Sequence, residues 1–357
     1  MPDLARAFAY DLRPVRVVFG EGAVHKLGEE IDVLSQGERV MIVSTPGRAD
    51  QVALARGALG ARFVGTFDGA AIHVPQAVVS RALDRVREWK PDIVVSVGGG
   101  SAVGVAKAVA MEVQLLHVAV PTTYSGSEMT DIWGITDGDR KQTGRDRRVA
   151  ACLVVYDPLL TASMPAVVSA ASGMNAIAHG VEALYSVSAH PAASLLAEES
   201  IRLLADSLPT VVGYPEDRDG RAAALRGAHF AGRALDMTAM ALHHKLCHVL
   251  GGSFALPHAL THAVVLPHAT AYNAPEAPEA MTAVARALGA QNVPAGLYQL
   301  NHRIGITQTL RDLGLGEADL DQAAALAVQS SYANPRPVTE VGVRALLDDA
   351  YHGRVPR

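Results

Sequence analysis

Six of the chain's fourteen histidines fall between residues 243 and 268, which makes this stretch the densest group of chemically capable side chains. Histidine titrates near neutral pH, so it can act as acid, base, metal ligand or anion binder. On a helix, His244 and His248 are four residues apart and share a face, as do His258 and His262. The stretch predicts two short helices that present imidazoles across a turn, and we interpret it as the reactive centre.

The turn between these helices is predicted by Gly251 and Gly252, which favour a helix end, and by Pro257, which suits a first helical turn. Imidazoles presented in this way can ligate a metal or hold an anionic substrate. We expect His262 and His268 to be packed histidines without a chemical role.

Asn175 and His179 form a second polar pair, four residues apart and therefore on one face of a predicted helix. Such pairs are routine on helices and indicate little alone. A basic run over residues 139–148 adds Lys141 and Arg145. These two cations are expected either to be solvated in a turn or to hold a substrate carboxylate.

Residues 92–101, DIVVSVGGGS, predict a buried strand, a glycine turn and a helix that begins near Ala102. Glycines let a backbone approach a pyrophosphate closely, and the first N–H groups of a helix favour negative charge. The pattern departs from the G-x-G-x-x-G fingerprint at Val103, and a plain tight turn is the competing interpretation. The candidate cofactor-binding residues here are Gly98, Gly99, Gly100 and Ser101.

A hydroxyl-rich loop that begins at Pro121 supports a dinucleotide site. It carries Thr122, Thr123 and Ser125, whose hydroxyls can bond phosphate or ribose. Loops of this composition are also common as simple turns.

The predicted strand over residues 39–44 ends in Ser44 and Thr45, which we add to the cofactor-binding candidates. A carboxylate at this point would grip the adenosine 2′-hydroxyl and repel a 2′-phosphate, but the chain has none here. We therefore expect both NADH and NADPH to be accepted.

The elements that position these residues change character after Asp157 and Pro158. Before this point, β-branched runs alternate with helical patterns, which favours a parallel sheet covered by helices. The predicted strands span residues 15–19, 39–44, 62–67, 92–97, 118–120 and 151–156. After Pro158, the Ala- and Leu-rich helical segments lack the alternation of apolar and polar residues that is typical of strands. We expect an α/β N-terminal dinucleotide-binding domain over residues 1–157, an all-α substrate and catalytic domain over residues 158–357, and a site in the cleft between them.

Composition favours a soluble enzyme with a small-molecule partner. Charged residues make up 19% of the 357 residues and the net charge is -5, with no cationic run that predicts binding to nucleic acid or an anionic membrane. No stretch reaches the roughly 20 apolar residues of a membrane span, so a cytoplasmic location is expected. Two cysteines are too few for a disulfide framework.

The order of these motifs resembles the group III, iron-dependent alcohol dehydrogenase superfamily over essentially the whole chain. The motifs are Gly98–Ser101, Pro121–Thr123, Asp157–Pro158, Asn175–His179 and the histidines 244, 248 and 258. The resemblance implies a dehydroquinate synthase-like fold of two domains. It also implies that the iron ligands, an Asp and three His, correspond here to Asn175, His179, His244 and His258.

Asn175 removes the only anionic ligand of that set, so we expect the metal to be absent or weakly bound. This departure, with Tyr124 in a shorter Thr-Thr loop and the HHKLCH run at residues 243–248, resembles the maleylacetate reductase branch. The resemblance implies NADH- or NADPH-dependent reduction of a small dicarboxylate, maleylacetate, to 3-oxoadipate in the breakdown of aromatic compounds. A homodimer is expected.

Within this branch we expect His248 or His244 to stabilise an enolate or supply a proton, while the other orients a carboxylate. His243 and Lys245 add complementary charge for a dianion, and His179 and His258 are reused for polar contacts. Three alternatives stay open: a metal-dependent alcohol dehydrogenase, a lyase like dehydroquinate synthase, and a non-catalytic dinucleotide-binding protein.

Overall fold

The computed structural model describes residues 7–138 and 140–356. The chain divides into two units, Arg13–Met164 and a second that joins Pro165–Arg357 with the segment ending at Leu12. The sequence placed the change after residue 157. The structure carries it further because Leu160, in the 3-10 turn Pro158–Thr161, packs into the core of the first unit.

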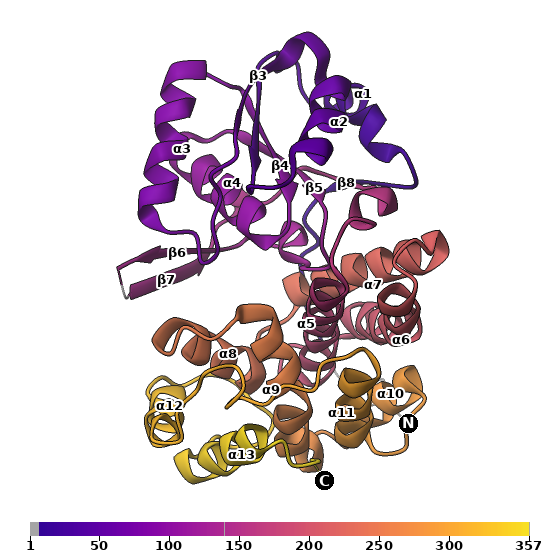
Figure 1. Cartoon of the computed structure of the whole chain (residues 1–357), viewed down its shortest axis with the longest axis vertical. Coiled ribbons are helices and arrows are strands. Elements are labelled where there is room, and N and C mark those ends of the chain that lie inside the picture. The colour runs from indigo at the N-terminus through magenta and orange to yellow at the C-terminus, as the bar shows by residue number, and fades with distance from the viewer. Residues whose placement is uncertain (1–6, 139, 357) are drawn as a thin grey trace. The chain divides into compact units, whose positions relative to one another are not determined.

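A parallel sheet of six strands forms the centre of the first unit, and each strand corresponds to one predicted from the sequence (Figure 1). Its order is β1-β8-β5-β4-β2-β3. The strands are β1 Arg16–Phe19, β2 Val40–Ser44, β3 Phe63–Phe67, β4 Ile93–Gly98, β5 Leu116–Pro121 and β8 Leu153–Tyr156. The continuous apolar runs in β2 and β4 are typical of strands buried on both faces.

Helices cover both faces of this sheet. Val40 and Ile42 of β2 share a core with α1 (Leu27–Leu34) and α2 (Ala49–Leu59). Met41 and Val43, one residue out of phase, pack with α3 (Gln76–Trp89) and α4 (Gly100–Val113). Because β2 connects outward to β3 and β4 connects the other way to β5, the connections reverse direction between β2 and β4. Ligands of open α/β sheets bind at the carboxyl ends of the strands at such a point.

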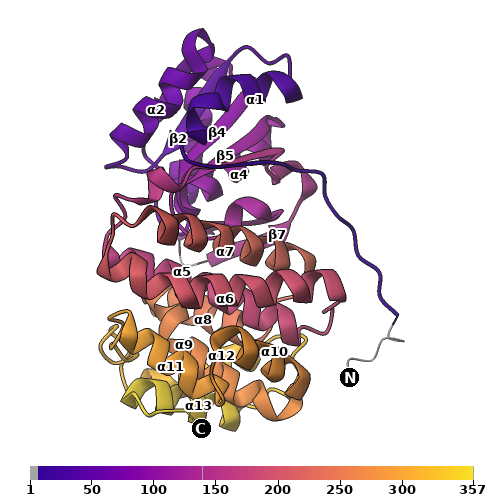
Figure 2. The ribbon, with the colours of Figure 1, turned by 90° about the vertical axis from the view of Figure 1, so that its right-hand side faces the viewer.

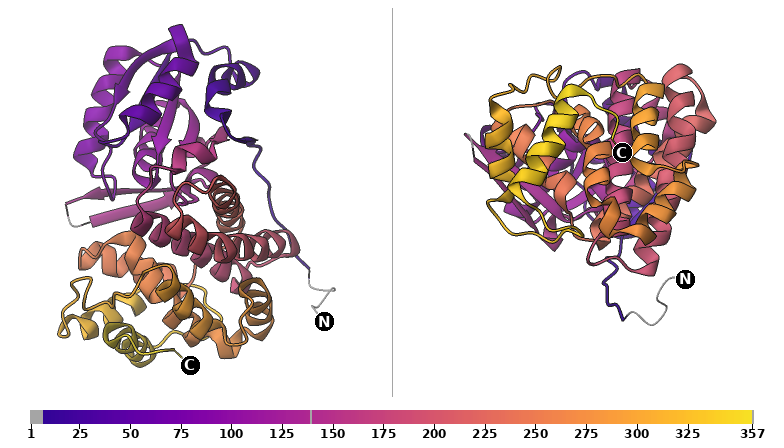
Figure 3. Two further views of the ribbon diagram at one scale, coloured as in Figure 1. Left: turned by 45° about the vertical axis from the view of Figure 1, so that its right-hand side comes forward. Right: turned by 90° about the horizontal axis from the view of Figure 1, so that it is seen from below.

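An antiparallel hairpin, β6 Ile132–Asp137 and β7 Arg140–Arg145, was missed by the sequence analysis (Figure 3). The run RKQTGR lacks the apolar alternation that marks a strand. The pairing is supported across the strands, where Gly144 leaves room for the Trp133 ring.

Helices are the regular elements of the second unit among its described residues, as predicted. Its helices are α5 Ala166–Tyr185, α6 Pro191–Gly213, α7 Arg218–Met237, α8 Leu242–Ser253, α9 His258–Asn273, α10 Pro278–Leu288, α11 Val293–Arg303, α12 Asp319–Val328 and α13 Glu340–His352. The largely buried helix α5 packs against α6, α7 and α9, and α6 and α7 lie side by side (Figure 2). Among the described residues, no helix has the length and apolar character needed to cross a membrane.

Two helix boundaries differ from the sequence-based expectation. Helix α4 begins at Gly100 rather than near Ala102, so its N-terminus lies within the glycine run. Helix α8 continues through Gly251 and Gly252 and ends at Ser253, with Ala255 in the left-handed region. Glycine weakens a helix only modestly, so packing of the preceding turns can carry α8 past it.

Candidate active site

Helix α5 presents Asn175, His179 and Glu182 at intervals of four and three residues, which places them on one face. All three side chains are buried. The sequence analysis assigned the first two and overlooked Glu182, although its spacing on the same face was a readable signal.

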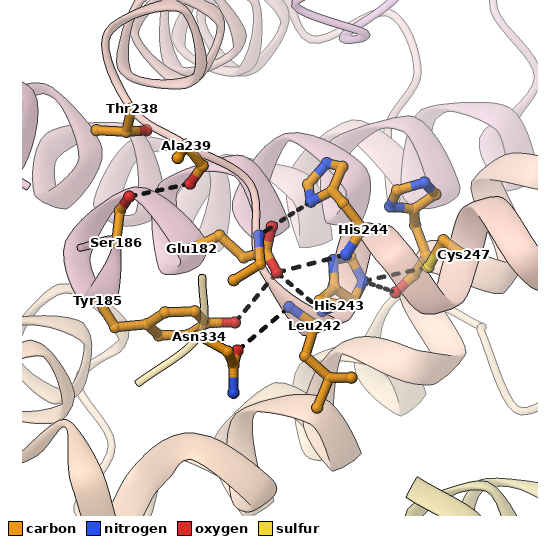
Figure 4. A network of polar contacts seen from close by, with 12 residues as sticks. Glu182, Tyr185, Ser186, Thr238, Ala239, Leu242, His243, His244, Cys247 and Asn334 are labelled. Carbon is orange, nitrogen blue, oxygen red and sulfur yellow. Dashed lines mark hydrogen bonds and ion pairs between the residues drawn. The ribbon is translucent and has the colours of Figure 1, made fainter. Parts of the chain in front are cut away.

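The Glu182 carboxylate organises the start of α8 (Figure 4). It accepts hydrogen bonds from the backbone N–H groups of Ala241, at 3.2 Å, and His243, at 2.8 Å. These are among the N–H groups that a helix N-terminus leaves without an internal partner. The N–H group between these two, that of Leu242, donates to Asn334 Oδ1 at 3.2 Å. The N-terminus of α8 is therefore held by a buried carboxylate and an amide.

Glu182 also fixes the orientation and tautomer of His244. The His244 Nδ1 lies 2.6 Å from a Glu182 carboxylate oxygen, so this nitrogen carries the proton and donates it. Burial alone would raise the pKa of Glu182, but the imidazoles of His244 and His243 outweigh it and the pKa lies below its usual value. The remaining His244 nitrogen, Nε2, is buried without a partner among the described residues. It offers a lone pair.

Three other imidazoles surround His244. Ring centroids lie 5.0 Å apart for His179 and His244, 4.9 Å for His244 and His262, and 5.1 Å for His243 and His244. His258 stacks edge-on against His262 at 4.5 Å. His262 is buried, as expected of a packed histidine, but it lies inside the cluster, and both of its ring nitrogens are buried without a partner in the described chain.

Burial keeps most of this cluster neutral. It lowers the pKa of His243 to about 4 and brings the pKa of His179 and His262 well below the usual value, with neighbouring imidazoles adding to the effect. His243 is therefore neutral and does not supply the positive charge that the sequence analysis expected from it.

The candidates His248, Lys245 and His258 are more accessible than the buried cluster, whereas His268 is not. His248 is exposed, with its ring centroid 6.4 Å from that of His244, and His258 is half-buried. Lys245 donates to Ser330 Oγ at 3.0 Å. His268 is buried in α9, and burial lowers its pKa to about 4.

The implied iron set does not fit iron well in this chain. Three atoms of the set are buried without a hydrogen-bond partner in the described chain: Asn175 Oδ1, His179 Nδ1 and His244 Nε2. As metal ligands, all three would be neutral. Iron prefers a carboxylate among its ligands in such sites. Among the described residues, His243, His244 and His262 form a group whose possible metal-ligand atoms lie close to one another. His179 and His258 are not part of this group.

The first unit brings most cofactor-binding candidates together at the carboxyl ends of β4 and β5. Gly98 pairs with Pro121 in the sheet, and Thr122 N–H donates to the Gly98 carbonyl at 3.0 Å. A Cβ at Gly98, which has a φ of 153°, would lie 2.8 Å from the Ala102 Cβ, and one at Gly99 would lie 2.7 Å from Thr123 Oγ1. Only glycine lets the two loops meet beside the N-terminus of α4.

This arrangement fits a dinucleotide phosphate. The N-cap residue of α4, Gly99, makes no side-chain capping bond among the described residues, and the first N–H groups and the dipole of a helix favour an anion. Thr122 Oγ1 is buried without a partner among the described residues, while Ser101 and Ser125 are half-buried. Ser44 differs, because its buried hydroxyl donates to the Val97 carbonyl at 2.7 Å and links β2 to β4.

A buried lysine missed by the sequence analysis supports the hydroxyl loop. Lys107 of α4 donates from Nζ to the carbonyls of Ser127 and Ile132, both at 2.7 Å, and to Thr130 Oγ1 at 3.0 Å. These bonds tie the segment after the loop to the helix that follows the glycines. The signal was a single lysine in the middle of a largely apolar helix.

The basic residues of β7 are only partly described. Arg145 forms an ion pair with Asp131 at 3.0 Å, and the Lys141 side chain lies outside the described residues. A substrate carboxylate at Arg145 would therefore compete with Asp131.

Residues 14–158 match the family of iron-containing alcohol dehydrogenases, and residues 169–351 match the C-terminal domain of the Fe-containing alcohol dehydrogenase family. The maleylacetate reductase of Sphingobium indicum is 48% identical over 349 residues, 98% of this chain and 99% of that protein. A maleylacetate reductase of Burkholderia cepacia is 44% identical over 350 residues, again 98% of this chain and 99% of that protein. The crystal structure of maleylacetate reductase from Agrobacterium tumefaciens superimposes with a TM-score of 0.94 at 41% identity, covering 98% of this chain and 100% of that one.

Proposed function

The chain belongs to the iron-containing alcohol dehydrogenase family, and from this premise we propose that it reduces the carbon–carbon double bond of maleylacetate to give 3-oxoadipate, with NADH or NADPH as reductant. Similarity to maleylacetate reductases over nearly the full chain is the observation that carries this function. The neutral side chain of Asn175 in the implied iron set agrees with it, because an enone needs less activation than a simple alcohol or carbonyl.

The substrate's double bond is conjugated to a ketone. A bound reduced nicotinamide would supply hydride to the alkene carbon far from the ketone. Negative charge then develops on the ketone oxygen. The alkene carbon next to the ketone takes up a proton, which completes the reduction. The protein must therefore stabilise an enolate and deliver one proton.

His248 and His244 divide these two tasks in our proposal. His248 is exposed on α8 and can donate an N–H to the enolate oxygen. In its charged form, His244 has a second proton on Nε2, which it can deliver to the substrate. The Glu182 carboxylate, which accepts from Nδ1, stabilises that charged form. We therefore assign the enolate to His248 and the proton to His244, supported by Glu182.

Charge and hydrogen bonding hold the rest of the substrate. Arg145 and Lys141 are proposed to bind a carboxylate, with Lys245 and Asn175 as further contacts. The glycine turn at residues 98–101 and the loop residues Thr122, Thr123 and Ser125 are proposed to bind the cofactor phosphates, with Thr45 near the adenosine ribose.

The direct test is loss of NADH absorbance with freshly made maleylacetate, with 3-oxoadipate identified as product by mass spectrometry. A simple alcohol with NAD⁺ serves as the comparison substrate. Robust alcohol oxidation without maleylacetate reduction would favour a metal-dependent alcohol dehydrogenase instead. Conversion of a substrate without net NADH consumption would favour a lyase like dehydroquinate synthase.

A further inference from the structure

Three histidines converge where α8 begins beside α9, and two of them lie outside the implied iron set. His243, His244 and His262 each offer a ring nitrogen, and these nitrogens all lie within 4.8 Å of one another. All three side chains are buried, at 0%, 6% and 1% exposure respectively. Such close approach of three imidazoles needs a physical explanation, because an unpaired buried ring nitrogen costs roughly 1–3 kcal/mol.

Hydrogen bonds leave ring lone pairs available in this group. His243 Nε2 lies 3.1 Å from the His262 carbonyl, which can only accept, so Nε2 carries the proton and Nδ1 is the acceptor. His244 donates from Nδ1 to Glu182, which leaves the lone pair on Nε2 of the neutral ring. An ion on this lone pair excludes the proton that the proposed reaction takes from the same nitrogen, so ion binding and proton delivery are alternative states of His244. Neither nitrogen of His262 has a partner in the described chain. Each histidine thus has a ring nitrogen with an available lone pair.

We propose that His243, His244 and His262 form a nitrogen-coordinated site for one zinc-class divalent cation. Three neutral imidazoles suit Zn²⁺ and its neighbours, whereas Mg²⁺ and Ca²⁺ prefer oxygen ligands. Zinc–nitrogen bonds of about 2.0–2.1 Å place ligand nitrogens about 3.3 Å apart, so small ring rotations close the group around the ion.

The residue behind His244 strengthens this assignment. A ligating histidine commonly donates its second ring N–H to a carboxylate, which fixes the tautomer and makes the ligand more basic. Glu182 occupies that position at 2.6 Å and contributes the negative charge that the three imidazoles lack. The site differs from the implied iron set because it uses His243 and His262 in place of Asn175, His179 and His258.

The test measures Zn²⁺ binding to the whole chain by competition with a chromogenic chelator, after all metal has been removed. We expect one Zn²⁺ per chain. His243→Asn and His262→Asn should each weaken binding on the order of 10²-fold, because each removes one ligand. His258→Asn and Asn175→Ala should leave the affinity unchanged, and His268→Asn controls for replacing a buried histidine of α9.

Two further measurements keep the outcome decisive if a variant folds poorly. Zn²⁺ should raise the melting temperature of the wild-type chain, since a ligand that binds only the folded state stabilises it. The Co²⁺-loaded wild type should show the strong visible absorption of a tetrahedral ion. Absence of stoichiometric Zn²⁺ binding by the wild type would overturn the proposal. Loss of binding in His258→Asn together with full binding in His262→Asn would overturn it too, and would assign the cation to the family's ligand positions.

Discussion

A single carboxylate, that of Glu182, both caps α8 and holds the proton of His244. Replacing Glu182 by Gln keeps the size and an acceptor oxygen but removes the charge that stabilises a His244 imidazolium. We predict that Glu182→Gln lowers kcat on the order of 10²-fold or more, with a smaller change in the KM for maleylacetate. Steady-state kinetics measure both, and the melting temperature of the variant reports the loss of the cap separately. An unchanged kcat in the folded variant would remove Glu182 from the proton-delivery step.

His248 is the exposed imidazole of α8 and the proposed donor to the enolate oxygen. We predict that His248→Ala lowers kcat on the order of 10²-fold, the cost of one oxyanion-stabilising donor, while NADH binding is nearly unchanged. Fluorescence titration of NADH and stopped-flow turnover separate these quantities. His268→Ala, which replaces a buried histidine of α9, should instead lower stability with little loss of turnover. The reverse pattern would show that the catalytic histidine is misassigned.

Thr45 follows β2 at the point where the strand connections reverse, and it is half-buried. We predict that Thr45→Asp raises the KM for NADPH on the order of tenfold more than the KM for NADH, because the new carboxylate repels the 2′-phosphate. Parallel titrations of the two cofactors provide the measurement. Equal changes for both would place Thr45 away from the ribose.

At the scale of elements, His117 ties neighbouring strands of the sheet together. Its ring lies 3.0 Å from Ser96 Oγ of β4 and 3.0 Å from the Val149 carbonyl, and burial lowers its pKa to about 4. A histidine held neutral in the folded state stabilises it above its unfolded pKa of about 6.5, and this contribution disappears as the pH falls toward 4.

We therefore predict that the wild-type chain loses up to about 3 kcal/mol of unfolding free energy through His117 between pH 6.5 and 4. His117→Gln should be less stable at pH 7 but should lack this part of the pH dependence. Urea unfolding at a series of pH values measures the difference between the two proteins. Parallel stability curves across this range would contradict a neutral, buried His117.

The elements that the sequence predicted are those with a strong local signal. The six strands of the sheet are runs of β-branched residues, and the glycine turn at residues 98–101 connects one of them to a helix. The β6–β7 hairpin was missed because its second strand is polar throughout. The convergence of His262 with His243 could not be predicted either, because it depends on how α8 and α9 pack and not on spacing within one helix.

At the scale of the whole molecule, sequence composition predicted two structural classes but not which segments belong to each unit. The segment that ends at Leu12 groups with the helical unit, where the Tyr10 ring stacks on His190 with centroids 4.1 Å apart. No local pattern reveals such a pairing across 180 residues. Asn175, in contrast, is a signal at one position of the sequence, because the resemblance implies an anionic iron ligand there.

That asparagine leads to a prediction for the enzyme as a whole. Turnover of maleylacetate should survive exhaustive chelation, because Asn175 cannot supply an anionic ligand and the proposed steps use histidine N–H groups. The measurement is kcat before and after chelation, with residual iron and zinc determined by mass spectrometry. The matched variant Asn175→Asp restores the carboxylate beside His179 and should bind Fe²⁺ more tightly than the wild type after the same treatment. Loss of wild-type activity on chelation, regained with Fe²⁺ or Zn²⁺, would show that a metal takes part in the reaction despite the missing carboxylate.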